Sequence, residues 1–483
     1  MLSQADNEIL VRVGRGTPMG ELMRQYWVPA LPSAEFPAPD SAPKRMKLLG
    51  ENLVMFRDSK GEMGCFVESC PHRGASLFFG RNEEEGLRCV YHGWKFDTTG
   101  ACVDMPSEPA ESNFKNKVRV RAYPCRDVNH MVWVYMGDRV EPPPFPQFEV
   151  NTLPPENVAP PSIMMEESNW FQNLEGDTDS NHLDYLHSRL DAFRYRVFGE
   201  KPKEGSKPGL FFQVWSDKMP RLDVRNTDYG VFYSARRKWD DEFGDRRPGD
   251  STPYEWHRIN QFIFPFHTMI TGQNGVTLRS FVPLDDEWAL LITQRGSYTQ
   301  KLFDPEHPQP TPLESQVGFV ERTSDPRTYF YTKANKHNDY QRDFTVERTQ
   351  MVSGVPAIGN LQDRAMTELM SNERGEVIYD RSHEHLGSLD VMCIAVRRRL
   401  LKAAKELRDN GVLPPNVDNA ELDRVRPATV VLPEGADWVA ATEKIRDGNA
   451  GTPPAHEIKP LAYLDEFKQT VEAEVVAAGG GGG

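Results

Sequence analysis

The sequence predicts an α+β protein in which a small all-β domain precedes a larger domain with an antiparallel sheet covered by helices. Between residues 40 and 140, short apolar runs are separated by turn-forming residues, a pattern typical of a compact β domain. The proline-rich stretch 141–146 is typical of a linker. Alternating stretches after residue 210 and an amphipathic pattern over 389–410 predict the sheet and a covering helix of the second domain.

The first domain contains two predicted hairpins and a closing strand. The turn at Asp58–Gly61 separates the apolar runs of the first hairpin, and Thr98–Gly100 separates those of the second. Residues 1–30 look helical, with a break at Gly16-Thr17-Pro18. The predicted strands cover residues 53–56, 65–67, 87–96, 101–103 and 131–136.

The second domain begins near residue 155 with a stretch, 163–190, that is predicted to be helical in large part. The helix over 389–410 should end at Asn410-Gly411, because glycine adopts the left-handed conformation that ends helices. A weaker helix is expected at 460–476. The predicted strands of this domain cover residues 210–214, 221–224, 230–235, 261–264 and 281–293.

These patterns divide the 483 residues into four regions, in keeping with the two or three domains that this length favours. The first two are an N-terminal helical segment (1–40) and the β domain (41–150). The second domain (151–415) and a C-terminal extension with a disordered glycine tail (416–483) follow.

Composition and charge argue against several classes of protein. A formal net charge of −14 disfavours a nucleic-acid partner, because phosphate binding depends on clustered Lys and Arg. No run approaches the roughly 18 apolar residues of a membrane-spanning helix. The first residues do not resemble a secretory signal, so we expect a cytoplasmic protein. Six cysteines are too few and too scattered for a disulfide framework, and the closely placed ones suggest metal or redox chemistry.

Two short motifs in the β domain each pair a cysteine with a histidine. Cys70-Pro71-His72 is followed by Cys89-Val90-Tyr91-His92, which offers two thiolates and two imidazoles. Such a set binds either a structural Zn²⁺ or a [2Fe–2S] cluster in which one iron is held by cysteines and the other by histidines. Zinc sites more often pair like ligands, as in C-x2-C and H-x3–5-H, which favours the cluster.

The segments Cys70–Gly74 and Cys89–Trp94 resemble the two loops of a Rieske domain. Replacing two thiolates with neutral imidazoles raises the reduction potential of a cluster relative to one held by cysteines alone. The bulky aromatic residues of the second loop could exclude water from the site. The resemblance implies that the [2Fe–2S] cluster is held by Cys70, His72, Cys89 and His92.

A second candidate site follows in the stretch Asp179–His187, which has the pattern D-x2-H-x4-H. Two histidines and a distant carboxylate would make the facial triad of a non-haem Fe(II) oxygenase, with positions left open for O2. Taken alone, two histidines at this spacing are more often packing or surface residues. Positions i and i+5 lie roughly 140° apart on a regular α-helix. Shared ligation by His182 and His187 therefore predicts a distorted helix between them, or a His187 beyond its end.

Over residues 5–415 the chain resembles the phthalate dioxygenase-like branch of the Rieske oxygenases. The segments Asp6–Leu10, Tyr26–Ala30, Asn169–Gly176 and Ile378–Arg381 carry this likeness. The resemblance implies a Rieske domain followed by a catalytic domain of helix-grip, START-like architecture. It also implies a homotrimer assembled head to tail. The chain departs from this branch by extra length near 240–258, near 303–333 and after 415, which could reshape a pocket or an interface.

By the same resemblance, the third iron ligand lies on a later helix that matches Gly359–Glu368, where we predict Asp363, with Glu368 as the alternative. An acidic residue in a first helical turn is also explained by the helix dipole. Asp179 would hydrogen bond His182 of its own chain and His92 of a neighbouring chain, and so link the two redox centres. The alternative for Asp179 is a helix cap, whose removal would have a mild effect.

The implied function is that of a terminal oxygenase that uses O2 to hydroxylate a small, aromatic organic substrate, by mono- or dioxygenation or by O-demethylation. The chain has no G-x-G-x-x-G after a strand and no C-x4-C-x2-C run. A separate NAD(P)H-dependent reductase is therefore expected, and the resemblance implies that it carries flavin and iron–sulfur groups. Ser180, Arg221 and Arg225 are candidates for binding a substrate carboxylate, although the arginines could equally be surface charges of a hairpin.

Two other functions are compatible with parts of the sequence. A Rieske electron-transfer protein would use the second domain only as a scaffold and would lack the mononuclear iron. The D-x2-H-x4-H pattern argues against this alternative. A zinc-bearing binding module without catalysis would be colourless.

Overall fold

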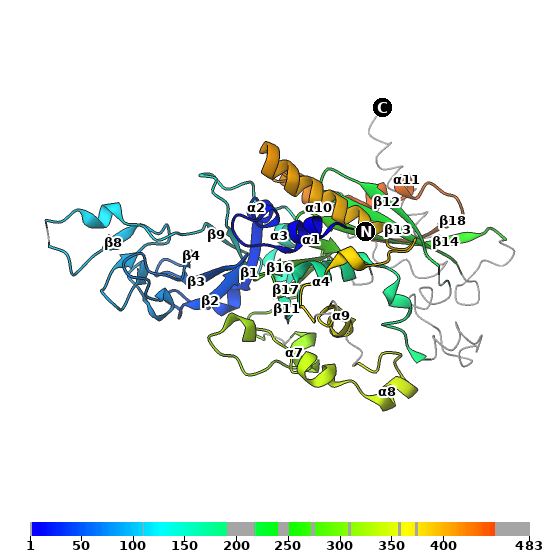
Figure 1. Cartoon of the computed structure of the whole chain (residues 1–483), viewed down its shortest axis with the longest axis horizontal. Coiled ribbons are helices and arrows are strands. Elements are labelled where there is room, and N and C mark those ends of the chain that lie inside the picture. Colours follow the sequence, from blue (N-terminus) through cyan, green and yellow to red (C-terminus); the bar gives the residue numbers. More distant parts are fainter. Residues whose placement is uncertain are drawn as a thin grey trace.

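The computed structural model is an elongated molecule with the β domain at one end and the larger domain at the other (Figure 1). Several regions discussed above lie outside the described residues. They are the strand predicted at 210–214, the helix predicted at 460–476, the glycine tail and most of the 240–258 segment. The described residues are 2–109, 111–190, 217, 219–239, 251–271, 276–307, 311–355, 359–371 and 375–449.

Two small antiparallel sheets form the outer part of the first domain. The hairpin predicted around Asp58–Gly61 is confirmed, with Leu53 opposite Val67 and with Val54 and Phe56 in the core of the domain. The stretch 87–96 forms two short strands with a loop between them, rather than one strand. The first sheet contains β2 (Lys44–Leu48), β3 (Glu51–Arg57) and β4 (Met63–Val67). The second contains β5 (Arg81–Glu83), β6 (Gly86–Arg88), β7 (Lys95–Phe96) and β8 (Cys102–Asp104).

A third sheet joins the N-terminal segment to the first domain. Its central strand is β10 (Met131–Tyr135), which pairs with β9 (Cys125–Val128) on one side and with β1 (Trp27–Pro32) on the other. The helical prediction for residues 1–30 is therefore wrong after Met23, because the apolar run of β1 is buried in this sheet. The sheet also crosses the boundary that the sequence suggested at residue 40.

An eight-stranded antiparallel sheet forms the centre of the second domain, in the order β11-β17-β16-β15-β14-β13-β12, with β18 also paired to β14. The single strand predicted at 281–293 is in fact the β16–β17 hairpin. The apolar strand β18 extends this sheet beyond the predicted domain end at residue 415. The strands are β11 (Val158–Glu166), β12 (Arg221–Asn226), β13 (Gly230–Lys238), β14 (Tyr254–Ile263), β15 (His267–Met269), β16 (Val276–Pro283), β17 (Ala289–Gly296) and β18 (Ala428–Pro433).

The long helix predicted over 389–410 is confirmed by α10 (Val391–Asn410), which lies along one side of the sheet (Figure 1). It ends at Gly411, whose φ of 66° is left-handed, as predicted. Its buried positions Met392, Val396 and Leu400 are four residues apart and so share one face, which packs on the core. Within the described ranges, no helix is both long enough and apolar enough to cross a membrane.

The prediction that 163–190 is largely helical is wrong in most of its length. Strand β11 occupies its first residues, and α4 (Trp170–Thr178) ends at Asp179, whose backbone is extended. Helix α9 (Gly359–Thr367) contacts α4, and in Figure 1 it lies between α4 and the short helices α7 (Pro312–Gln316) and α8 (Phe344–Thr349). The other short helices are α1 (Gln4–Val11), α2 (Pro18–Met23), α3 (Glu149–Thr152), α11 (Trp438–Ala441) and α12 (Glu443–Arg446).

Candidate metal centres

The two cysteine–histidine motifs form loops of matching backbone structure. Gly74 donates its N–H to the carbonyl of Cys70, and Gly93 donates to that of Cys89, both at 2.9 Å. The glycines have φ angles of 75° and 78°, which residues with a Cβ rarely adopt. The N–H of each cysteine is also bonded, at 2.8 Å, to the carbonyl of the residue five positions later. The same pattern of backbone hydrogen bonds therefore shapes both loops, and Arg88 adds a side-chain bond at 2.8 Å to the carbonyl of Gly93 in the second.

These loops bring the four predicted cluster ligands together. The rings of His72 and His92 lie 4.5 Å apart between centroids, and Cys70 and Cys89 are both buried. Burial, together with the adjacent thiol of Cys89, raises the pKa of Cys70 to about 11. His72 Nδ1 is buried and has no hydrogen-bond partner among the described residues, which suits a nitrogen that binds metal. Two thiols and two imidazoles so arranged can hold a [2Fe–2S] cluster.

The two histidines of the second motif converge with Asp363. His182 begins a 3₁₀ turn, η5 (His182–Asp184), His187 follows in the next turn, and Asp363 comes from α9. One nitrogen of each imidazole and one oxygen of Asp363 lie within 4.8 Å of one another. The Asp363 Oδ1 atom is 2.9 Å from His187 Nε2 and 3.5 Å from His182 Nε2. Two imidazoles and one carboxylate around one point are the donors of a facial triad.

The backbone between the histidines is not a regular helix, as their spacing predicted. Asp179 ends α4, and its carboxylate accepts the N–H groups of Asn181 at 2.7 Å and His182 at 3.2 Å. The 3₁₀ turn then ends at Tyr185, whose φ and ψ of −120° and −61° leave the helical region. This break brings the rings of His182 and His187 to 5.1 Å between centroids.

Each histidine of the triad is oriented by a second side chain. Asp179 Oδ2 lies 3.2 Å from His182 Nδ1, and Gln362 Oε1 lies 2.7 Å from His187 Nδ1. Both imidazoles can thus donate through Nδ1 and present Nε2 to a metal. Burial acts to raise the pKa of Asp363, but the hydrogen bond with His187 and the charges of both imidazoles outweigh it and lower the pKa. The carboxylate is therefore ionised, as a metal ligand must be.

Comparison with known proteins identifies the family of this chain. Residues 26–124 match the Rieske [2Fe–2S] domain, and residues 134–453 match the LigXa C-terminal domain like family. The 3-chlorobenzoate-3,4-dioxygenase oxygenase subunit of Comamonas testosteroni is 39% identical over 454 residues, which cover 92% of this chain and 98% of that protein. The chain is a Rieske non-haem iron oxygenase.

Further relatives agree with this assignment. The phthalate 4,5-dioxygenase oxygenase subunit of Pseudomonas putida is 33% identical over 446 residues, covering 91% of this Rieske oxygenase and 94% of that subunit. A crystal structure of dicamba monooxygenase bound to dicamba shares the fold, with a TM-score of 0.50 and 16% identity over 80% of this chain and 98% of that one. The predicted fold and family are confirmed. The oxygenase relatives do not favour a pure electron-transfer protein, and the match to the Rieske [2Fe–2S] domain argues against a zinc-binding module.

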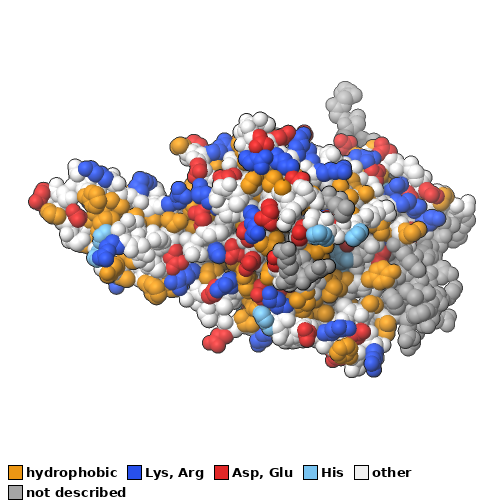
Figure 2. All heavy atoms as spheres, in the orientation of Figure 1, with side chains coloured by type: hydrophobic (Ala, Val, Ile, Leu, Met, Phe, Trp, Pro, Cys, Tyr) orange, Lys and Arg blue, Asp and Glu red, His pale blue; other side chains and the backbone are white. Residues whose placement is uncertain are grey.

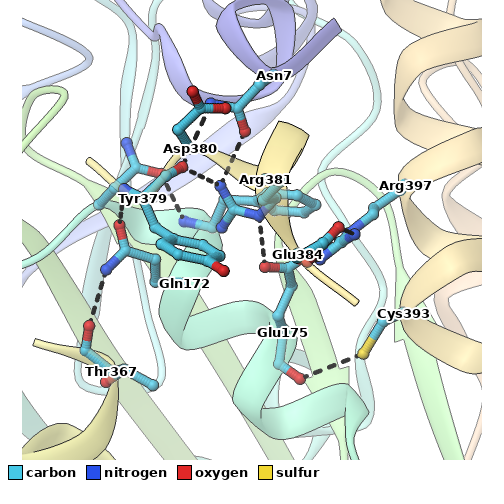
Figure 3. A network of polar contacts seen from close by, with 12 residues as sticks. Asn7, Gln172, Glu175, Thr367, Tyr379, Asp380, Arg381, Glu384, Cys393 and Arg397 are labelled. Atoms are coloured by element: carbon cyan, nitrogen blue, oxygen red, sulfur yellow. Dashed lines mark hydrogen bonds and ion pairs between the residues drawn. The ribbon is translucent and has the colours of Figure 1, made fainter. Parts of the chain in front are cut away.

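The sequence did not point to the polar network that anchors α4 in this Rieske oxygenase (Figure 3). Glu175 on α4 accepts from the buried Arg381 at 2.7 Å and also pairs with Arg397 on α10. Gln172, one turn earlier, donates to the carbonyl of Thr367 at the end of α9 at 2.8 Å. Gln172 and Glu175 belong to the 169–176 segment and Arg381 to the 378–381 segment, both of which carry the family likeness, and this likeness is the sequence clue to the network.

A second link, through the sheet, joins α4, which precedes the two histidines, to α9, which carries Asp363. Arg279 on β16 pairs with Asp177 of α4 at 2.9 Å and donates to Asn360 of α9 at 3.0 Å. Glu368, the alternative third ligand, points elsewhere, because its carboxylate accepts from Arg364 at 2.6 Å and from Tyr340. The structure thus brings Asp363, and not Glu368, to the two histidines.

The three predicted substrate residues do not form one cluster. Arg221 and Arg225 lie on β12, are largely exposed and pair with Glu255 and Asp223, respectively, so neither guanidinium is free for a buried carboxylate. Ser180 is buried beside Asp179, and its hydroxyl lies 3.5 Å from the Nη1 atom of Arg258 on β14. Sequence patterns did not single out Arg258, because it sits inside an otherwise unremarkable strand.

Proposed function

We propose that this Rieske oxygenase holds one mononuclear iron at His182, His187 and Asp363 and uses it with O2 to hydroxylate an aromatic substrate. The observation that carries the proposal is the convergence of these donors from two segments far apart in the chain. A bound Fe(II) would supply open coordination positions at which O2 is activated beside the substrate. The protein supplies orientation, because Asp179 and Gln362 hold both imidazoles with Nε2 toward Asp363.

We also propose that the electrons cross between chains of a homotrimer, through Asp179. Two apolar surfaces support this assembly. In the Rieske domain, Val90 and Tyr91 are more than half exposed beside His92. In the catalytic domain, Tyr185 borders a cavity of about 680 Å³ that is otherwise lined mainly by apolar and aromatic side chains, including Leu186, Tyr340, Phe344, Val355, Met366 and Leu369. Burial of the first surface against the second would bring the cluster histidine of one chain toward Asp179 of the next.

The proposed substrate class is an aryl carboxylate. The two relatives named above act, by their names, on chlorobenzoate and phthalate. Arg258 is 6% exposed, and no carboxylate of the described residues lies within ion-pair distance of it. Its only side-chain hydrogen bond to those residues is the long contact with Ser180. A buried guanidinium without a carboxylate partner favours an anionic ligand, which it binds through two hydrogen bonds.

The Arg258→Gln variant tests the substrate assignment. Loss of a charged hydrogen bond costs about 1.5–3 kcal/mol, so kcat/KM for aryl carboxylates should fall roughly 10- to 100-fold. The matched Arg225→Gln variant should keep normal kcat/KM, because Arg225 is exposed and paired with Asp223. An equal loss with carboxylates and with their neutral amides would show that Arg258 does not recognise the carboxylate.

Spectroscopy and metal analysis of the purified protein test the function as a whole. We expect a red-brown protein with a Rieske EPR signal after anaerobic reduction and about three irons per chain. Addition of a reductase, O2 and an aryl carboxylate should then yield hydroxylated product. A Rieske signal with iron for the cluster alone, even after treatment with Fe(II), would contradict the mononuclear site.

A further inference from the structure

Cationic side chains without ion pairs are concentrated in one part of the Rieske domain. Residues 41–140 contain 15 Lys and Arg against 13 Asp and Glu, although the whole chain has a net charge of −14. Most of these cations pair with carboxylates, as Arg45 does with Glu68 and Arg57 with Asp127. Those without a carboxylate within 4.0 Å among the described residues are Arg73 and the basic ridge, which we define as Lys115, Lys117, Arg119, Arg121 and Arg126.

The basic ridge is exposed and follows the chain along the edge of the domain. All five of its side chains are solvent-exposed, and Val118 and Val120 between them face inward. Figure 2 shows Lys and Arg side chains spaced along the upper margin of this end of the molecule. Such a surface is repelled by cations and attracts an acidic protein, whose encounter it would steer.

The start of the ridge lies against the cluster loops. The ridge begins in η3 (Phe114–Lys117), where the Phe114 ring is 43% exposed. This ring packs edge-on against Trp94 at 6.0 Å, and Trp94 stacks on His72 at 4.2 Å with an interplanar angle of 15°. A protein that docks on η3 is therefore separated from a cluster ligand by two aromatic rings in contact.

We propose that the basic ridge is the docking surface for the electron donor of this oxygenase, an iron–sulfur protein with acidic side chains around its own cluster. The inference rests on the proposed function, in which a separate protein reduces the Rieske cluster. The surface at Val90 and Tyr91 combines these two apolar side chains with the single cation Arg73, whereas the ridge presents five cations, so the donor and the neighbouring subunit use chemically different surfaces. One electron passes from the reduced donor cluster to the oxidised Rieske cluster at each encounter.

Stopped-flow reduction of the holoenzyme by a reduced plant-type [2Fe–2S] ferredoxin tests the surface. The Lys115→Glu/Lys117→Glu variant should react at least about 10-fold more slowly than the wild type at low ionic strength. Added salt should slow the wild type steeply and leave the variant nearly unchanged, because screening removes the steering. The matched control is Arg398→Glu/Lys444→Glu, which makes the same change of charge at exposed positions of the catalytic domain.

Dithionite, a small reductant that needs no docking surface, separates the possible outcomes. Normal dithionite reduction with slow ferredoxin reduction in the ridge variant alone supports the docking surface. Normal dithionite reduction with equal ferredoxin rates in wild type and ridge variant, or an equal loss in the control variant, overturns the docking surface only. A wild-type cluster that dithionite cannot reduce overturns both the surface and the proposed function.

Discussion

The predicted cluster site and the proposed mononuclear iron site of this chain are built in different ways. In the Rieske domain, two short loops with the same pattern of backbone hydrogen bonds carry the four ligands, and all of them lie within 23 residues. In the catalytic domain, the triad combines a broken turn after α4 with a carboxylate from α9, which lies far along the chain. Side chains such as Gln362, rather than backbone bonds, orient its histidines.

This difference predicts that the two centres respond to different kinds of substitution. A site held by backbone geometry depends on the residues that allow that geometry, which here are glycines with positive φ. A site held by side chains depends on the hydrogen-bond partners of its ligands, whose loss typically costs 10- to 100-fold in metal affinity. The two kinds of change should therefore affect one centre and spare the other.

The largest effect is expected for the Asp363→Asn variant. It replaces the anionic donor of the proposed triad, so we expect loss of the mononuclear iron and of product formation, with an unchanged cluster spectrum. Glu368→Gln is the matched control, because Glu368 is bound to Arg364 and lies outside the triad. Iron analysis and EPR of both proteins check the result. If Glu368→Gln lost the iron and Asp363→Asn kept it, the assignment of the ligand would be reversed.

A smaller effect of the same kind is expected for Gln362→Leu. The substitution removes the acceptor at 2.7 Å from His187 Nδ1 but leaves all three proposed ligands in place. Titration with Fe(II) should show affinity reduced by roughly 10- to 100-fold, with normal reduction of the Rieske cluster. Gln362→Glu restores an acceptor and should recover most of the affinity. Equal affinity in Gln362→Leu and wild type would show that the histidine is oriented by other contacts.

The same difference explains how much of the molecule could be predicted from the sequence. The cluster ligands are local, so the spacing of Cys70, His72, Cys89 and His92 was sufficient to recognise the motif. The broken turn between His182 and His187 followed from helix geometry together with the assumption that both histidines bind one metal. Asp363 required the family resemblance, because no local pattern relates it to histidines so far away.

Long-range contacts explain the errors as well. Residues 27–30 fall in the predicted N-terminal helical segment, but they belong to β1, which contains two prolines and pairs with β10, about 100 residues later. Strand β18 lies in the segment that the sequence assigned to a C-terminal extension, but it pairs with β14 in the central sheet. Arg258 and Gln362 acquire their candidate roles only from residues that the fold places beside them. Such partners are set by tertiary structure, which local propensity does not encode.

Glycine substitutions test whether the backbone geometry of the two cysteine–histidine loops controls binding of the cluster. In Gly93→Ala the new Cβ would lie 2.6 Å from Pro106 Cγ, whereas in Gly74→Ala its nearest neighbour is Ser69 Oγ at 3.6 Å. Both variants adopt an unfavourable φ, which costs about 1–2 kcal/mol, and Gly93→Ala adds a steric overlap of about 1–3 kcal/mol. Cluster content and thermal unfolding should therefore fall more in Gly93→Ala, with Fe(II) binding at the triad retained. Equal behaviour of the two variants would mean that the loop backbone tolerates the overlap.

The smallest expected effect is on the pH dependence of the free energy of unfolding, and it comes from a histidine in the sheet of the catalytic domain. His267 is buried among aromatic rings, and burial lowers its pKa to about 3. Below about pH 6.5 the unfolded chain binds a proton at this position that the folded protein does not, so stability falls as the pH falls. The loss should reach about 2 kcal/mol at pH 5 relative to pH 7. Urea unfolding at the two pH values should show this loss reduced in His267→Gln but unchanged in His307→Gln, whose side chain is 74% exposed. An unchanged loss in His267→Gln would assign the acid sensitivity to another buried group.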